Sequence, residues 1–257
     1  MLLVKLGGSV ITDKSKLRTA RPLVLDRLAR EAATAKDDLI LVHGAGSFGH
    51  ILAEKYSLHK GYHDDSQLEG VAEVQRDVRG LNLMVVDALR EAGARPISIP
   101  PGIAVKFSGG MLRELDVDLF KEYLRLRMIP VTFGDVVLDD TWRFSICSGD
   151  DLMLELSRVF RPTKSIFVAD VDGVFTGDPK AKGKGELLRE IRTEDVGKVN
   201  LSMRSGADVT GGLEGKLRKM FEAAGHAGES WILNGLVAGR LKDAIAGKSF
   251  VGTRVVA

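Results

Sequence analysis

Glycine and lysine recur in short segments that follow apolar runs. The first of these segments, Lys5-Leu6-Gly7-Gly8-Ser9, directly continues the apolar run that begins at Leu2. The N–H groups of paired glycines approach a ligand closely and form a concavity that binds anions. Lysine is rarely buried in an apolar strand without a partner, although it can snorkel to an exposed edge. Because the glycines follow immediately, we predict that Lys5 faces a phosphate.

A second glycine-rich segment, His43 to His50, contains Gly44-Ala45-Gly46-Ser47-Phe48-Gly49. The pattern G-x-G-x-x-G is typical of a dinucleotide site when it lies on the first strand-to-helix turn and an acid closes the next strand. Here it follows the second predicted strand, and the next strand ends in Ile99-Pro100. This motif alone therefore identifies no particular phosphate ligand. The P-loop pattern G-x-x-x-x-G-K-[ST] does not occur, which argues against a P-loop kinase.

In two later segments, acidic residues or glycines lie at the predicted ends of strands or helices. Residues 170–179 read Asp-Val-Asp-Gly-Val-Phe-Thr-Gly-Asp-Pro after an apolar run. Their aspartates are ordinary turn formers, or they hold a nucleotide or orient Mg²⁺. Residues 210–216 read Thr-Gly-Gly-Leu-Glu-Gly-Lys. A glycine pair at a helix N-terminus offers N–H donors to a phosphate, and Lys216 either reaches the same anion or is plain surface charge.

Ser148-Gly149-Asp150-Asp151 opens a further predicted helix. Serine is a preferred N-cap, and acids in the first turn complement the helix dipole. The dipole accounts for Asp151, and Gly149 is the predicted ligand contact.

Strands and helices alternate along the chain, which predicts crossover units and a mostly parallel sheet. Such sheets bind ligands at the carboxyl ends of their strands, where the glycine-rich segments lie. The predicted strands cover residues 2–6, 39–42, 96–99, 129–133, 165–168 and 231–233, with a hairpin at 136–146 and a last strand near Phe250. The predicted helices begin near Pro22, Val71, Asp116, Ser148, Glu214 and Leu241.

Composition bounds the class of protein. The 257 residues suit one large α/β domain or two merged lobes. A formal net charge of +2 is too small to indicate nucleic-acid binding. No apolar run reaches the length of a membrane span, and the first residues lack a secretory h-region. The single cysteine, Cys147, cannot form an internal disulfide and fits a reducing compartment. We therefore expect a cytoplasmic protein without a membrane or nucleic-acid partner.

In their order along the chain, these motifs resemble the amino-acid kinase superfamily, and the resemblance covers essentially the whole sequence. It implies an α/β fold, a three-layer sandwich around a mostly parallel central sheet. Residues 1–160 would form an N-terminal acceptor-binding lobe and residues 161–257 a C-terminal ATP-binding lobe within one continuous sheet. It also implies ATP and Mg²⁺ as cofactors, a small-molecule acceptor and a homodimer.

Within the superfamily the chain resembles the isopentenyl phosphate kinases, through Ile11-Thr12-Asp13-Lys14, the segment ending at His50, and residues 148–151. The implied catalytic residues are Lys5, Lys14, His50 and Lys216. The implied acceptor site comprises Ala45, Gly49, His50 and Gly149, with Val71, Val74 and Ile146 either lining a slot for an isoprenoid tail or serving as simple core. The implied ATP site comprises Lys5, Gly7, Gly8, Ser9, Gly46, Asp170, Phe175, Thr176, Gly177, Asp178, Pro179, Lys180, Gly211, Gly212 and Lys216. No residue is assigned as a metal ligand. Two residues depart from the family pattern. Leu213 stands where Met or Ile is common, and Ala45 stands where Gly is common.

The resemblance implies ATP-dependent phosphorylation of isopentenyl phosphate to isopentenyl diphosphate. Such an acceptor is mostly dianionic at neutral pH, because its second pKa is about 6. It needs no general base, and catalysis requires positioning and charge neutralisation, with His50 donating a hydrogen bond to the acceptor phosphate. Three alternatives remain open from sequence: a fosfomycin, UMP or glutamate kinase of the superfamily, a regulator that senses ATP without turnover, and a Rossmann dehydrogenase.

Overall fold

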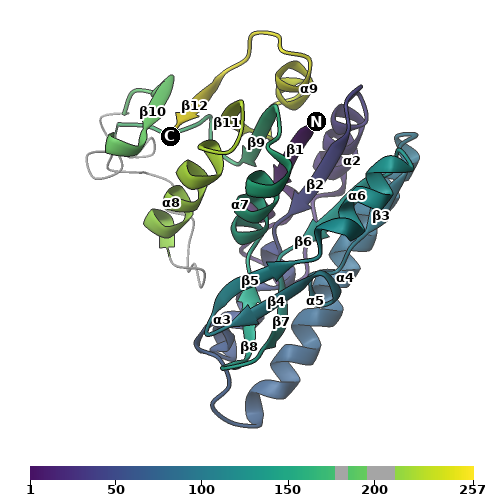
Figure 1. The fold of residues 1–257 in the computed structure, drawn as a ribbon, viewed down its shortest axis with the longest axis vertical. Helices are drawn as coiled ribbons and strands as arrows, with labels where there is room; N and C mark the ends of the chain where they lie inside the picture. Colours follow the sequence, from purple (N-terminus) through teal and green to yellow (C-terminus); the bar gives the residue numbers. More distant parts are fainter. Residues whose placement is uncertain (177–184, 196–211) are drawn as a thin grey trace.

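The computed structural model describes residues 1–176, 185–195 and 212–257 (Figure 1). Gly177, Asp178, Pro179, Lys180 and Gly211 lie outside the described residues. The main sheet has eight described strands in the order β10-β12-β11-β9-β1-β2-β6-β3. Neighbouring strands are parallel except β11 and β12, so the predicted mostly parallel sheet is confirmed.

The strands of the main sheet are β1 (Leu2–Leu6), β2 (Leu39–His43), β3 (Pro96–Ser98), β6 (Ile129–Phe133), β9 (Lys164–Ala169), β10 (Glu190–Arg192), β11 (Glu229–Asn234) and β12 (Gly252–Val256). A smaller sheet contains β4 (Val105–Ser108), β5 (Met111–Leu115), β7 (Asp135–Asp139) and β8 (Arg143–Cys147) in the order β5-β4-β7-β8. The helices are α1 (Gly8–Ile11), α2 (Pro22–Ala32), α3 (His50–Lys55), α4 (Ser66–Glu91), α5 (Pro101–Ala104), α6 (Val117–Arg125), α7 (Gly149–Phe160), α8 (Gly212–Ala224) and α9 (Arg240–Ile245).

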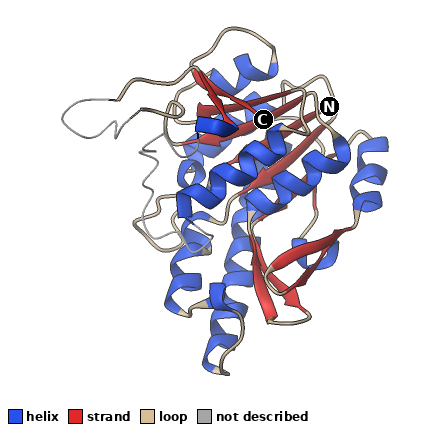
Figure 2. Cartoon of the chain, turned by 60° about the vertical axis from the view of Figure 1, so that its left-hand side comes forward, coloured by secondary structure: helices blue, strands red, loops and turns tan. Residues whose placement is uncertain are grey.

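The side chains of β1 alternate between two apolar cores, one on each face of the sheet. Leu2, Val4 and Leu6 pack with buried residues of α2, α4 and α9. Leu3 packs on the other face with residues of α7 and α8. Helices thus cover both faces, as the two views show (Figure 1, Figure 2). By the same alternation, Lys5 lies on the face covered by α7 and α8.

Local signals placed several helix ends correctly. Pro22 occupies the first turn of α2. The Asp116 carboxylate accepts a hydrogen bond from Leu119 N at 3.2 Å and caps α6. Ser148 and Asp151 form a reciprocal capping box at α7. These contacts confirm the predicted starts of α2, α6 and α7, whereas α4 begins at Ser66, before the predicted start near Val71.

The predicted strands differ from the structure in three places. The last strand begins at Gly252 rather than near Phe250, whose ring packs against Trp231 with centroids 4.9 Å apart. The β4–β5 hairpin was not predicted, because Phe107 is the only fully buried apolar side chain in its two strands. β10 was also missed. It is three residues long and lies at the sheet edge.

Asp139 joins the two hairpin turns of the smaller sheet. Its buried carboxylate accepts hydrogen bonds from Gly109 N at 3.0 Å and Gly110 N at 2.8 Å in the β4–β5 turn. It also accepts from Trp142 N at 2.7 Å and Ser145 Oγ at 2.6 Å on the β7–β8 side. Burial by itself raises the pKa of Asp139, but these donors outweigh it and hold the pKa far below its ordinary 3.8. The ionised carboxylate is therefore part of the fold.

We expect Asp139→Asn to lower the free energy of unfolding by about 2 kcal/mol at pH 7, because an amide leaves donors unpaired. A depressed folded pKa stabilises the protein above the unfolded pKa, and this contribution disappears as pH falls through the folded pKa. The difference between variant and wild type should therefore be constant near neutrality and shrink below about pH 4. Urea unfolding at several pH values measures it. Asp140→Asn, at an exposed neighbour, is the matched control; an equal loss there would contradict the prediction.

Candidate active site

The two glycine-rich loops after β1 and β2 touch through their backbones. A Cβ on Gly8 would lie 2.5 Å from Gly46 N and 2.6 Å from Gly46 Cα. A Cβ on Gly44 would lie 2.7 Å from Gly8 N. Gly46 also has a φ of +52°, which glycine adopts without strain. The glycine types of both motifs follow from this close approach, which presents backbone amides at the carboxyl ends of adjacent strands.

Thr12 and Ser47 fasten these loops together. Thr12 Oγ1 donates to Gly8 O at 2.6 Å and accepts from Ser47 N at 3.0 Å. Arg18 N and Thr19 N donate to Ser47 O and Ser47 Oγ, both at 3.2 Å. Sequence reasoning did not single out Thr12 or Ser47. Both polar residues are buried, but burial is not visible in the sequence.

The same contacts place two predicted catalytic residues. Thr12 and Ala20 form an isolated antiparallel bridge, so Lys14 lies in the short loop between them. The later part of this loop is bonded to Ser47 through Arg18 N. His50 is the first residue of α3, three positions after Ser47, and is half-buried. The segments that carry Lys14 and His50 therefore meet at Ser47, beside the glycine loops.

Lys5 reaches across the sheet edge to the N-terminus of α7. Its Nζ forms an ion pair with Asp150, and the two side chains are 15% and 6% exposed. A Cβ on Gly149 would lie 3.2 Å from Lys5 Cε, so this side chain passes directly over the first residue of the helix. This pairing rules out the alternative that Lys5 snorkels to an exposed edge of the sheet. Asp150 was not predicted as a site residue; the need of a buried lysine for a partner was the available signal.

The predicted acceptor residues are neighbours around Gly134, the residue between β6 and β7. A Cβ on Gly134 would lie 3.5 Å from Ala45 N and 3.6 Å from Gly149 N. A Cβ on Gly49 would lie 2.6 Å from Ala45 Cβ. Backbone amides from the loop after β2 and from the N-terminus of α7 thus converge near Lys5, an arrangement suited to an anion.

Val71, Val74 and Ile146 belong to one apolar cluster. Val74 is 2% exposed, while Val71 and Ile146 are partly buried and pack against the same cluster. All three side chains therefore belong to the large core that also contains β1 and α2, and their role in holding a tail stays a prediction.

Asp170 and Asp172 have different surroundings after β9. Ser9 Oγ donates to Asp170 Oδ1 at 2.9 Å, which joins the ends of β1 and β9. Asp172 accepts from Asn234 Nδ2 at 3.0 Å and pairs with Arg240. Asp170 is exposed at the sheet edge, whereas Asp172 anchors its segment to the loop after β11.

The remaining predicted ATP residues follow from this segment and from α8. Gly7 donates its N–H to Val168 O at 2.8 Å, so the first glycine lies against β9. Phe175 bridges to Leu187, and the exposed Thr176 donates its N–H to Glu186 O at 3.0 Å. Gly212 begins α8, and the half-buried Lys216 follows one turn later, on the helix that packs against α7.

Within the described ranges, no group of three or more His, Cys, Asp and Glu residues is arranged to hold a metal ion. In the same ranges, none of the helices is long and apolar enough to cross a lipid bilayer.

Comparison with known proteins agrees with this arrangement. Residues 1–234 match the amino acid kinase family. The chain is 36% identical to the isopentenyl phosphate kinase of Thermoplasma acidophilum, over 98% of this chain and 99% of the relative. It is 37% identical to the isopentenyl phosphate kinase of Methanothermobacter thermautotrophicus, over 99% of this chain and 98% of the relative. A solved isopentenyl phosphate kinase structure superposes with a TM-score of 0.85 at 35% identity and covers 99% of both chains. The chain therefore belongs to the amino acid kinase family.

Proposed function

We propose that this kinase transfers the γ-phosphoryl group of ATP to isopentenyl phosphate, which gives isopentenyl diphosphate for isoprenoid biosynthesis. The observation that carries the proposal is the placement of Lys5 over Gly149, at a helix N-terminus next to the two touching glycine loops. The full-length similarity to isopentenyl phosphate kinases supports the choice of acceptor. Family membership overturns the alternative of a Rossmann dehydrogenase.

The acceptor needs charge neutralisation rather than a base. Its phosphate, mostly dianionic above about pH 6, already carries a nucleophilic oxygen. The N–H groups of Ala45 and Gly149 and the ring of His50 hold this phosphate. Lys5 and Lys14 lower the repulsion between it and the γ-phosphate, and the amides of Gly8 and Ser9 line the transferred group.

ATP binds across the segment after β9 and the start of α8. Asp170, Phe175 and Thr176 flank the nucleotide, and Lys216 neutralises its phosphates. Mg²⁺ commonly binds through one or two carboxylates together with substrate phosphates. The exposed Asp170 fits that requirement, because Asp172 is engaged by Arg240. Mg²⁺ bound with ATP supplies positive charge at the phosphates.

The two lobes follow from these assignments. Residues 1–160 contribute the acceptor side and residues 161–257 the ATP side. In support, α7 ends at Phe160, the capping residue Arg161 has a left-handed φ of 43°, and β9 begins three residues after Arg161. Both lobes share the main sheet, because β9 pairs with β1 along its length.

We also propose a cytoplasmic homodimer. Leu83 and Met84 on α4, Ile103 on α5 and Leu138 on β7 are exposed apolar side chains on elements that adjoin. Covering them with a second copy removes apolar surface from water. Light scattering coupled to size exclusion distinguishes a monomer of 27.9 kDa from a dimer.

The test of function is ADP release with isopentenyl phosphate, dimethylallyl phosphate and fosfomycin as parallel acceptors. We expect turnover with isopentenyl phosphate and a lower kcat/KM for fosfomycin. Preference for fosfomycin would instead identify the antibiotic kinase of the same superfamily. ATP binding without turnover of any acceptor would identify an ATP-sensing regulator.

His50 provides a residue-level test of the acceptor site. We expect His50→Ala to lower kcat/KM for isopentenyl phosphate about 100-fold, because one donor to the acceptor phosphate is lost. The KM for ATP should change little. His59→Ala, on an exposed turn beyond α3, is the matched control. Unchanged kcat/KM in the His50 variant would remove this residue from the mechanism.

A further inference from the structure

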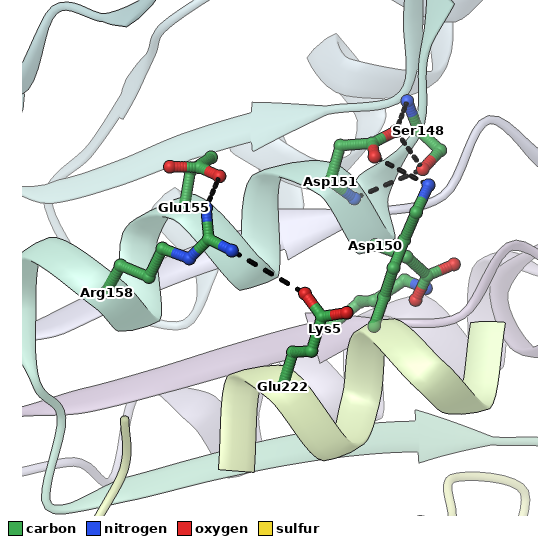
Figure 3. Close-up of polar contacts among 8 residues, drawn as sticks. Lys5, Ser148, Asp150, Asp151, Glu155, Arg158 and Glu222 are labelled. Carbon is green, nitrogen blue, oxygen red and sulfur yellow. Dashed lines mark hydrogen bonds and ion pairs between the residues drawn. The ribbon is translucent and has the colours of Figure 1, made fainter. Parts of the chain in front are cut away.

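Two consecutive carboxylates in the first turn of α7 point to different elements. Asp150 pairs with Lys5 of β1. Asp151, the next residue of α7 (Figure 3), has its Oδ1 atom 2.6 Å from Lys219 Nζ of α8. The first turn of α7 therefore pairs with one lysine from β1 and one from α8. The first pair belongs to the candidate site described above, whereas Lys219 has no role in it.

The carboxylate that Lys219 contacts is rigidly held. Asp151 Oδ2 accepts from Ser148 N at 3.1 Å and from Ser148 Oγ at 2.6 Å. Ser148 Oγ in turn accepts from Asp151 N at 3.1 Å. Oδ2 thus serves the capping box and leaves Oδ1 for Lys219. The side chains of Lys219 and Asp151 are 31% and 20% exposed, so solvent screens this pair only in part.

Lys219 shares its helix face with Lys216. Residues three apart on a helix are neighbours on its surface. An ion pair that holds Lys219 against the first turn of α7 therefore also fixes the turn of α8 that carries Lys216. That first turn of α7 contains Gly149 and the partner of Lys5. The pair thus connects the start of α8 to the point where the acceptor and Lys5 meet.

A second ion pair joins the same helices farther along. Arg158 of α7 lies 3.5 Å from Glu222 of α8 and 2.7 Å from Glu155 (Figure 3). Arg158 and Glu222 are 46% and 45% exposed, and they lie away from the glycine loops toward the end of α7. This pair resembles the first in type but not in position, so it is the internal control.

We infer that Lys219 is a positioning residue: its ion pair with Asp151 holds α8 in register with α7, so that Lys216 meets the ATP phosphates opposite Lys5. The inference rests on the proposed function for the role of Lys216. Lys219 itself need not touch either substrate. Loss of the pair lets the first turns of α8 shift, and small displacements of a charge-neutralising group reduce the rate strongly.

The experiment compares five variants in steady-state kinetics. Lys219→Gln and Asp151→Asn each remove the pair, and the asparagine keeps an oxygen for the Ser148 cap. We expect each to lower kcat about tenfold, with KM for isopentenyl phosphate within about twofold of wild type. Lys219→Arg should restore most of the rate, and Arg158→Gln should be close to wild type. The double variant of Lys219 and Asp151 should be no slower than either single variant, because both remove one interaction.

Hydrogen exchange gives a readout that needs no acceptor. Amides in the first turns of α8 should exchange faster in Lys219→Gln and Asp151→Asn than in wild type. Their exchange rates in Arg158→Gln should equal those of wild type. Equal rates and equal exchange in all variants would overturn the inference, as would an Arg158 effect of the same size. Failure of the wild type to phosphorylate isopentenyl phosphate would overturn the proposed function instead. In that case the exchange measurement still decides the role of Lys219.

Discussion

Lys5→Gln should lower kcat about 1,000-fold, the largest loss that we expect from removing one charge at this site. The lysine is 15% exposed, paired with Asp150 and in contact with Gly149, so its ammonium is oriented before substrates arrive. Glutamine retains length and a polar end but carries no positive charge toward the transferred group. Coupled ADP release at saturating ATP and isopentenyl phosphate measures the change.

A substitution of Asp150, the ion-pair partner of Lys5, separates the effect on catalysis from the effect on folding. Lys5→Gln leaves Asp150 buried without its ion pair, which by itself destabilises the protein. The double variant Lys5→Gln with Asp150→Asn removes both charges. It should recover much of the thermal stability and none of the activity. Recovery of activity along with stability would show that Lys5 matters only for folding.

Gly8→Ala should abolish activity and lower the free energy of unfolding by about 3 kcal/mol or more. The added methyl would lie 2.5 Å from Gly46 N and 2.6 Å from Gly46 Cα, and backbone atoms cannot move aside as a flexible side chain does. The two loops must separate, which displaces the amides that line the transferred group. Urea unfolding and ADP release, measured on the same preparation, report both effects.

Gly80→Ala is the matched control for this substitution. Gly80 lies within α4, and a Cβ there would meet nothing within 4 Å. Alanine in an open helical position should stabilise the protein by about 0.5–1 kcal/mol and leave kcat unchanged. If Gly8→Ala unfolded no more easily than this control and kept its activity, the two loops would not need their close contact.

The helix starts and the β1 and β2 loops were predictable because their signals are contiguous in sequence. Ser148 and Asp151 are three residues apart and make their capping box within one turn. Gly7 and Gly8 directly follow an apolar strand, and so does Gly44. Each pattern depends on backbone geometry over a few residues, which the local sequence dictates. The β4–β5 hairpin lacked such a signal, because most of its side chains are exposed or half-buried.

The pairing of charges was beyond sequence reasoning, because it depends on long-range packing. Lys5 and Asp150 are 145 positions apart, and only the parallel sheet with α7 on its face brings them together. The same holds for Lys219 with Asp151 and for Thr12 with Ser47. By itself the sequence determined the fold class, the order of the motifs and the kinds of residue at the site. Tertiary structure decided which lysine meets which carboxylate, since that depends on how helices pack on the sheet and not on local propensity.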